Sequence, residues 1–463
     1  MRRAGSIQKR FARVPVLLTY CMPSALQSTS ITAVSRGDSN RLEANDRAAH
    51  DWYRFVLSFP PHLVREYINR FELGANACVL DPFCGTGTTI VECKKCGIAS
   101  VGVEAHPMSH FASVTKIDWS PDPDKLETSA AAVAERAIDI LERNGIIDDP
   151  QPNLIRETPS MAALRTLPSD SFKLLLTNSI SALPLHKTLV LLDAIDGAPC
   201  YQDHMRLALA RALVSTISNL HFGPEVGVGP PKEDAPVVST WLGRVLQIAH
   251  DLRILRRLPR ADAVAHRGDS RMLKSLLKPK SIDAVFTSPP YPNEKDYTRT
   301  TRLETVLLRF VRDKRELQKL KRMMLRSNTR GVYKGDDDHQ WISDVNEITR
   351  LADEIEARRV AMGKTSGFER LYATVTKLYF GGMARHLADL RPALRKHAML
   401  GYVVGDQASY LRVMIRTGQI LASIAKRLGY EVISIDLFRT RLATATREQL
   451  REEVVVLRWP GQK

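Results

Sequence analysis

The sequence has few cysteines and no long apolar run. Six cysteines among 463 residues are too few for a secreted disulfide framework and are typical of a cytosolic protein with free thiols. The longest apolar run near the start, around Val16–Leu18, is far shorter than the ~20 residues that a membrane helix requires. We therefore expect a soluble protein with no membrane association. With 25 glycines, 25 prolines and 44% hydrophobic residues, collagen-like and wholly disordered chains are excluded.

Acidic residues are in the minority, and the first 37 residues contain none. The chain has 67 Lys and Arg against 51 Asp and Glu, a formal net charge of +16, which favours a polyanionic partner. We predict a basic, flexible arm over residues 1–45. An organellar transit peptide and an over-extended start of translation have the same composition, so both remain open.

Short apolar runs rich in β-branched residues alternate along the chain with segments of helical periodicity. The runs predict seven buried strands: Ala77–Leu80, Ser100–Glu104, Ala263–Arg267, Ile282–Thr287, Ala398–Val404, Glu431–Leu437 and Glu452–Arg458. The helical segments are Lys125–Arg143, Met205–Leu220, Trp241–Arg256, Leu303–Met324 and Ala384–Arg395. This alternation predicts an α/β fold with a mostly parallel sheet covered on both faces. The two long gaps between strands, after Glu104 and after Thr287, predict two helical insertions.

A glycine-rich turn follows the first predicted strand. Gly85 and Gly87 allow a sharp turn and a close approach of a ligand to the backbone, and the next helix would begin with free N–H groups. Asp81 stands at the strand's carboxyl end, where open α/β sheets bind ligands, and Glu104 ends the next strand, where an acid can accept hydrogen bonds from a ribose. An exposed surface acid is the alternative for Glu104. Ile90 occupies the position of the third glycine of a dinucleotide-binding fingerprint, which argues against a dehydrogenase.

The turn Asp81-Pro82-Phe83-Cys84-Gly85-Thr86-Gly87-Thr88 resembles the cofactor loop of amino-group DNA methyltransferases. These enzymes make N4-methylcytosine or N6-methyladenine with S-adenosyl-L-methionine. The resemblance implies a Rossmann-like methyltransferase fold and a cofactor site that includes Phe83, Gly85, Gly87 and Glu104. We expect Asp81 and Thr86 of the same turn to belong to that site. The upstream segment 59–64 is similar to one that packs beside this loop in the family.

A second motif, Ser288-Pro289-Pro290-Tyr291, follows the predicted strand Ile282–Thr287. The exocyclic amino group of a base is a poor nucleophile, and it needs acceptors that orient its hydrogens. The Ser288 oxygen and the Pro289 carbonyl can be those acceptors, while the two prolines fix the backbone. Tyr291 can stack on a base extruded from the duplex. A rigid turn in which Tyr291 merely packs is the alternative.

The second motif resembles the Ser-Pro-Pro-Tyr of N4-cytosine methyltransferases, whereas N6-adenine enzymes more often begin the tetrad with Asp or Asn. Ser288 therefore favours cytosine as the target base. The cofactor loop precedes the tetrad here, which is unlike the common order among N4 enzymes and leaves the target-recognition region open. Asp269, at the end of the third strand, is expected to bind the adenine of the cofactor or, equally, to cap a helix that begins near Arg271.

A basic segment follows the second motif, Ser288–Tyr291. Between residues 309 and 330 there are two acids and nine basic residues: Arg309, Arg312, Lys314, Arg315, Lys319, Lys321, Arg322, Arg326 and Arg330. We expect this segment to contact DNA phosphates, with a solvated helix face as the alternative. Arg439 and Arg441 could add contacts. Cys93 and Cys96 have half the spacing of a zinc or redox site, and no second pair completes it, so no metal is expected.

These features predict a site-specific enzyme that methylates the N4 of cytosine in double-stranded DNA within a restriction-modification setting. Alternatives are an N6-adenine enzyme, an RNA base methyltransferase and an inactive methyltransferase-like DNA-binding protein. We expect the cytoplasm of a bacterial, archaeal or phage-type host; a cognate restriction nuclease and the oligomeric state stay open. The predicted division of the chain is an arm at 1–45, core parts at 46–120, 263–300 and 396–463, a helical insertion at 121–262 and a basic, DNA-recognising insertion at 301–395.

Overall fold

The computed structural model describes residues 42–54, 58–148, 164–222, 225–293, 295–442 and 449–461. The chain divides into two units, Met1–Ser39 and Asn40–Lys463, and all described residues belong to the second. The predicted basic arm, residues 1–45, thus falls almost entirely outside the described residues. In the described part of the chain, no helix is both long and apolar enough to cross a membrane.

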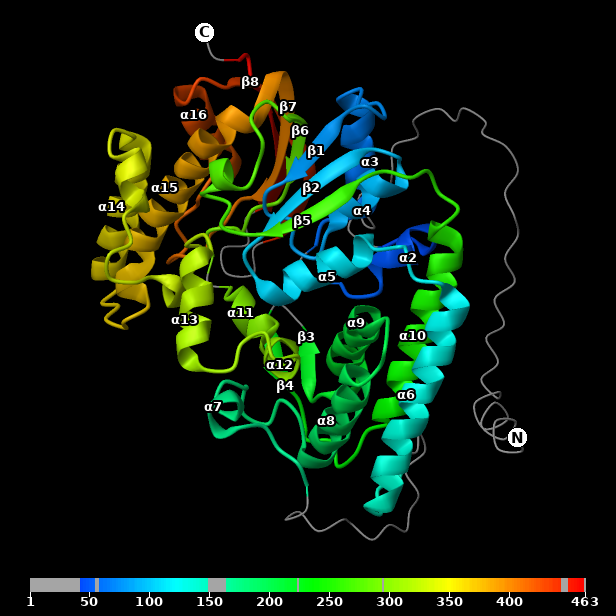
Figure 1. Ribbon diagram of the computed structural model, residues 1–463. Coiled ribbons are helices and arrows are strands. Elements are labelled where there is room, and N and C mark those ends of the chain that lie inside the picture. The colour runs from blue at the N-terminus through cyan, green and yellow to red at the C-terminus, as the bar shows by residue number, and fades with distance from the viewer. Residues whose placement is uncertain are drawn as a thin grey trace. The chain divides into compact units, whose positions relative to one another are not determined.

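A seven-stranded sheet forms the centre of the second unit (Figure 1). In spatial order the strands are β5 (Ala263–Arg267), β2 (Ala99–Glu104), β1 (Cys78–Asp81), β6 (Ile282–Thr287), β7 (Leu394–Gly405), β9 (Gln449–Arg458) and β8 (Glu431–Leu442). The pairs from β5 to β7 are parallel, and β9 runs antiparallel to both of its neighbours. All seven predicted strands are confirmed, and the fold is the expected mostly parallel, Rossmann-like α/β architecture.

Successive residues of the central strands bury their side chains on opposite faces of the sheet. On one face, Leu80 and Val285 pack in the apolar cluster that contains α15 (Tyr372–Leu390) and α16 (Thr417–Arg427). On the other face, Val79 and Phe286 pack with α3 (Pro61–Arg70) and with Cys93 of α4 (Thr88–Lys95). Burial on both faces explains why these strands are continuous apolar runs in the sequence.

The chain between β2 and β5 is mainly helical. It contains α5 (Pro107–Ile117), α6 (Pro123–Arg143), α7 (Ser169–Phe172), α8 (Ala182–Asp196), α9 (Gln202–Ala212) with a π-helical turn (Leu213–Ile217), a hairpin of β3 (Leu220–Phe222) and β4 (Val226–Val228), and α10 (Val237–Leu255). Helices α6, α8, α9 and α10 pack together beside the sheet (Figure 1). The predicted helices over 125–143 and 241–256 are confirmed, and the helix predicted over 205–220 ends before the hairpin.

The chain between β6 and β7 is also helical. Its elements are α11 (Tyr297–Thr300), α12 (Arg302–Leu307), α13 (Lys314–Met323), α14 (Asn346–Ala361) and α15. The single helix predicted over 303–324 is wrong, because Arg309 adopts a φ of 65° that no helix accommodates and Asp313 starts α13 by accepting the N–H of Glu316. The helix predicted over 384–395 is wrong in both bounds: α15 begins at Tyr372, and β7 already begins at Leu394.

The strand order reverses direction at β1, which pairs with β2 on one side and with β6 on the other. Such a switch point leaves a crevice at the carboxyl ends of the strands, where α/β proteins bind ligands. The glycine-rich turn follows β1 and the Ser-Pro-Pro-Tyr turn follows β6, so the topology places both turns at this crevice.

One other α-helix completes the described segments. A short helix, α2 (Arg47–His50), precedes α3, and single 3₁₀ turns connect several of the longer elements. Helix α2 contacts α10, α4 and α5 beneath the sheet. It thereby joins the first insertion to the core.

Candidate active site

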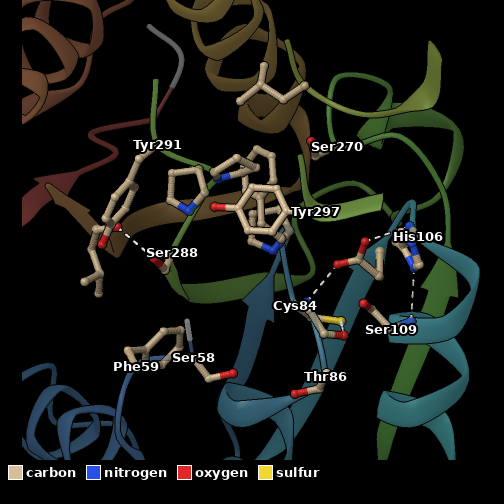
Figure 2. Close-up of a pocket in the computed structure, with 18 of the residues that line it drawn as sticks. Ser58, Phe59, Cys84, Thr86, His106, Ser109, Ser270, Ser288, Tyr291 and Tyr297 are labelled. Atoms are coloured by element: carbon tan, nitrogen blue, oxygen red, sulfur yellow. Dashed lines mark hydrogen bonds between the residues drawn. The ribbon is translucent and has the colours of Figure 1, made fainter. Parts of the chain in front are cut away.

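The two turns border one cavity of about 310 Å³. Its walls include the following residues predicted for the site: Phe83, Gly85, Thr86, Glu104, Ser288, Pro289, Pro290 and Tyr291. Figure 2 shows Ser288 and Tyr291 on one side of the cavity, Cys84 and His106 on the other, and Tyr297 between them. Segments that lie some 200 residues apart in the sequence therefore share one space.

The two glycines of the first turn differ in what surrounds them. Both have left-handed backbones, with φ of 52° at Gly85 and 89° at Gly87. A Cβ on Gly87 would lie 3.1 Å from the Cβ of Ser113, so this glycine lets α4 approach α5. A Cβ on Gly85 would meet nothing within 4 Å, and Gly85 lines the cavity. Gly87 therefore serves packing, and Gly85 leaves room for a ligand.

Glu104 ties the turn to the end of β2. Its Oε2 accepts the N–H of Gly85 at 2.8 Å, and its Oε1 accepts the N–H of His106 at 2.7 Å. Burial raises the pKa of the Glu104 carboxyl to about 7, and the nearby charge of Asp81 adds to the effect. Each carboxylate oxygen keeps a further lone pair, and the side chain lines the cavity.

Asp81 is buried beneath the cavity and does not line it. Its Oδ1 accepts the hydroxyl of Thr287 at 2.5 Å and the N–H of Phe83 at 3.2 Å. These bonds join the carboxyl end of β1 to that of β6. Burial raises the pKa of Asp81 to about 6, and the hydrogen bonds oppose that rise.

The hydroxyl of Ser288 donates to the carbonyl of Val403 on β7 at 3.1 Å (Figure 2). Because its proton is used in this way, the Ser288 oxygen can act toward the cavity only as an acceptor. The Tyr291 ring lies over Gly405, where a Cβ would come within 2.9 Å of Tyr291 Cε2. Burial raises the pKa of the Tyr291 hydroxyl, so it stays protonated.

Asp269 does not line the cavity, although its neighbours Gly268 and Ser270 do. Its carboxylate accepts from the guanidinium of Arg271, with Nε at 3.0 Å and Nη2 at 2.7 Å, and from the Arg271 N–H at 2.9 Å. No helix begins at Arg271; a single 3₁₀ turn spans Leu273–Ser275. Asp269 thus forms a buried ion pair with Arg271 near the cavity wall. The helix predicted to begin near Arg271 is absent.

Several lining residues were missed in the sequence. His106 Nε2 lies 3.0 Å from the hydroxyl of Thr301, and burial lowers the pKa of His106 to about 3, so the ring is neutral. His106 stands two residues after Glu104 at the same strand end, which was an available signal. Tyr297 and Thr301 come from the second insertion, where no pattern pointed to the site. Ser58, before α3, was also missed, whereas Phe59 belongs to the segment 59–64 that was expected beside the loop, and both line the cavity.

The basic segment 309–330 is more neutralised than its composition indicates. Within salt-bridge distance of carboxylates lie Arg309, Arg312, Arg315, Lys321 and Arg326. Arg322 and Arg330 stack on Tyr333 and Phe368. Lys314 and Lys319 are exposed and have no carboxylate within that distance among the described residues. The end of α13 reaches the cavity, whose wall includes Met323 and Met324.

The remaining sequence candidates lie away from the cavity. Cys93 is buried within α4, and Cys96 is exposed at its end. Among the residues that the structure describes, no group of three or more His, Cys, Asp or Glu side chains is placed to hold a metal ion.

Comparison with known proteins agrees with this geometry. Residues 29–112 match the model of a DNA methylase family that comprises the N6 and N4 enzymes. The Type II methyltransferase M.BsoBI of Geobacillus stearothermophilus is 24% identical over 457 residues, which cover 89% of this chain and 84% of that protein. These matches support the amino-group DNA methyltransferase family.

Two further relatives match shorter stretches. The Type II methyltransferase M.AvaI of Anabaena variabilis is 30% identical over 195 residues, 38% of each chain. The Type II methyltransferase M.MjaII of Methanocaldococcus jannaschii is 33% identical over 69 residues, 15% of this chain and 13% of that protein. The amino-methyltransferase family implies S-adenosylmethionine as methyl donor. The cavity fits such a group, because Gly85 leaves open space beside the Glu104 carboxylate.

Proposed function

We propose that the protein is a site-specific DNA methyltransferase that transfers a methyl group from S-adenosylmethionine to the exocyclic N4 of cytosine. One observation carries the proposal: the glycine-rich turn and Ser288–Tyr291 border the same cavity. The resemblance of the tetrad to that of N4-cytosine enzymes favours cytosine over adenine.

In this proposal the first turn holds the cofactor, which supplies an electrophilic sulfonium methyl group. Gly85 lets the cofactor approach the backbone, and Phe83 and Thr86 contact it. Glu104 accepts hydrogen bonds from the ribose hydroxyls through the lone pairs that the N–H groups of Gly85 and His106 do not use. Asp81 and Gly87 do not line the cavity and act on the site through the residues around them. Asp81 holds the two strand ends together, and Gly87 sets the packing of α4. Asp269 acts through Arg271, which it holds beside the cavity wall.

The second turn is proposed to orient the base. The Ser288 oxygen, whose proton is given to Val403, and the Pro289 carbonyl accept the two amino hydrogens, which points the nitrogen lone pair at the methyl group. Pro289 and Pro290 keep these acceptors fixed, so little reorganisation is needed during the reaction. Tyr291 supplies the aromatic face for the extruded base.

Double-stranded DNA is the proposed partner, and residues 301–395 are the proposed DNA-recognition part. Helix α13 supports this, because its exposed Lys314 and Lys319 lead along the helix to the cavity wall at Met323. Cations in this position would hold phosphates near the extruded base. We further propose the remaining division at 46–120, 121–262, 263–300 and 396–463, and a restriction-modification setting in the cytoplasm of a prokaryotic host, as the relatives' printed names suggest.

A methyl-transfer assay tests the proposal. Purified protein is incubated with tritiated S-adenosylmethionine and either duplex DNA or RNA, and the labelled nucleoside is identified. We expect label in N4-methyldeoxycytidine and none in RNA. Ser288→Ala should remove most of the transfer, while Ser275→Ala, at an exposed position away from the cavity, should not. Label in N6-methyladenine or in RNA contradicts the proposed substrate. Tight DNA binding without any transfer supports an inactive protein instead.

A further inference from the structure

Three charged side chains of β8 and β9 line the cavity beside the turn Ser288–Tyr291. Arg439 and Arg441 lie two residues apart on β8, and Glu452 lies opposite Arg439 on β9. Arg439 Nε donates to Glu452 Oε2 at 2.5 Å, and Arg441 Nε lies 3.5 Å from Glu452 Oε1. One buried carboxylate thus fixes the positions of two guanidinium groups.

This cluster is adjacent to Tyr291. A Cβ on Gly405 would lie 2.9 Å from Tyr291 Cε2 and 3.3 Å from Glu452 Cγ, so the ring and the carboxylate side chain pack over the same glycine. A base stacked on Tyr291 would therefore have the cluster within reach of its edge. The sequence suggested only unspecified DNA contacts for Arg439 and Arg441.

Arg441 has hydrogen-bond donors to spare. Its Nη2 donates to the carbonyl of Asp406 at 3.3 Å, and its Nε is buried without any hydrogen bond. Its Nη1 has no acceptor within hydrogen-bond distance among the described residues. The Nε faces the Glu452 carboxylate at 3.5 Å, so Nη1 is the donor that remains for an acceptor on a ligand in the cavity that Arg441 lines.

We propose that Arg441, held in place by Glu452, donates to the 2-keto oxygen of the target cytosine. The inference rests on the proposed function and explains its choice of base. Cytosine presents an amino group, a ring acceptor and a keto oxygen along one edge, so Ser288 can hold the amino end while Arg441 holds the keto end. Adenine has an amino group and no keto oxygen, and it would leave the Arg441 donors unpaired.

A phosphate oxygen of the extruded nucleotide is the other acceptor that a guanidinium commonly binds. The cluster is less suited to it, because Glu452 cancels one of the two positive charges. The two acceptors are experimentally distinct. A phosphate contact weakens binding equally for every base and changes the salt dependence, whereas a base contact changes discrimination between bases.

The test begins with the modified nucleoside in DNA from expressing cells, which gives the product and the recognition sequence. The kcat/KM is then measured on two duplexes of that sequence, one with the target cytosine and one with a 4-aminopyrimidine analogue that lacks the keto oxygen. The proteins are the parent, Arg441→Met, Arg441→Lys and the control Arg451→Met. Arg451 is on β9 next to Glu452, but it pairs with Glu453 at 2.6 Å and does not line the cavity.

We expect the parent to lose about tenfold to a hundredfold in kcat/KM on the analogue. Arg441→Met and Arg441→Lys should lose a similar factor on cytosine and little more on the analogue, while Arg451→Met behaves like the parent. Folding of each variant is checked by S-adenosylmethionine binding, which Arg441 does not serve.

Three results would overturn the inference. If Arg441→Met discriminates between cytosine and the analogue as strongly as the parent does, the proposed contact is refuted. Equal losses on both duplexes, a lower salt slope and recovery in Arg441→Lys assign Arg441 to phosphate. In both cases N4-methylcytosine is still the product, so the proposed function stands. A product of N6-methyladenine instead refutes the proposed function and the inference together.

Discussion

The charge on Glu104 should control how tightly S-adenosylmethionine binds between pH 6 and pH 8. Both of its oxygens already accept backbone N–H groups, from Gly85 and His106, so a ribose must use the lone pairs that remain. A protonated Glu104 carboxyl has a hydroxyl in place of one acceptor oxygen. This hydroxyl would either face a backbone N–H, donor against donor, or replace the acceptor that the ribose hydroxyl needs. The ionised form is therefore the one that binds.

The magnitude follows from the pKa of Glu104, which burial raises to about 7. The ionised fraction rises from about one tenth at pH 6 to about nine tenths at pH 8, so the Kd should fall about tenfold over this interval. The folded state holds this proton more tightly than the unfolded chain does. Glu104 therefore lowers the free energy of unfolding as the pH rises from about 4.5 to about 7.

Isothermal titration calorimetry with S-adenosylmethionine at pH 6, 7 and 8, at one ionic strength, measures the effect. Glu104→Gln is the matched variant, and it should bind weakly with a Kd that changes little with pH. Asp81, with a pKa of about 6, titrates in both proteins and is thereby controlled for. A parent Kd that is constant or rises with pH, or a Glu104→Gln variant that keeps the tenfold change, would refute the reasoning.

Three further substitutions test the neighbouring contacts. Gly87→Ala should lower the free energy of unfolding by about 2–4 kcal/mol, because φ is 89° and the new Cβ would lie 3.1 Å from that of Ser113; urea denaturation measures it, and a neutral effect contradicts the packing role. Gly85→Ala should lower stability by only about 1 kcal/mol and weaken S-adenosylmethionine binding about tenfold or more, since its Cβ enters open cavity space; calorimetry showing unchanged binding would disprove this. Thr287→Val should cost about 1–3 kcal/mol by removing a donor to buried Asp81, with a larger loss at pH 8 than at pH 5 because the carboxylate is then ionised; a loss independent of pH would count against it.

The central strands were predictable because their physics is local. Ile282–Thr287 has the predicted bounds, because all but one of its residues are buried and the strand reads as an apolar run. The edge strand Ala263–Arg267 also has the predicted bounds, although none of its residues is fully buried. At β7 the strand begins four residues before the predicted start, at Leu394. The residues between are the polar Arg395, Lys396 and His397, whose side chains are exposed and hide the strand from an apolar pattern.

The helices of the second insertion were predicted less well. The break after Leu307 depends on the positive φ of Arg309, and neither glycine nor proline marks it. The Arg309 guanidinium pairs with Asp193 and Asp196 of α8. Contacts between segments this far apart cannot be read from periodicity.

The site was predictable as far as strand ends determine it. Parallel neighbours end at the same edge of a sheet, so the turns after β1 and β6 had to meet. The environments of individual side chains were not predictable in this way. Arg271 engages Asp269, and Arg441 enters the cavity wall from an antiparallel pair at the far end of the chain.

Mass spectrometry of nucleosides tests the central claim most directly. DNA is taken from a methylation-deficient bacterial host that expresses the parent protein or Ser288→Ala. The account predicts N4-methyldeoxycytidine with the parent, at one sequence motif, and its near absence with the variant. N6-methyldeoxyadenosine in its place, or N4-methyldeoxycytidine at equal levels with Ser288→Ala, would contradict the account.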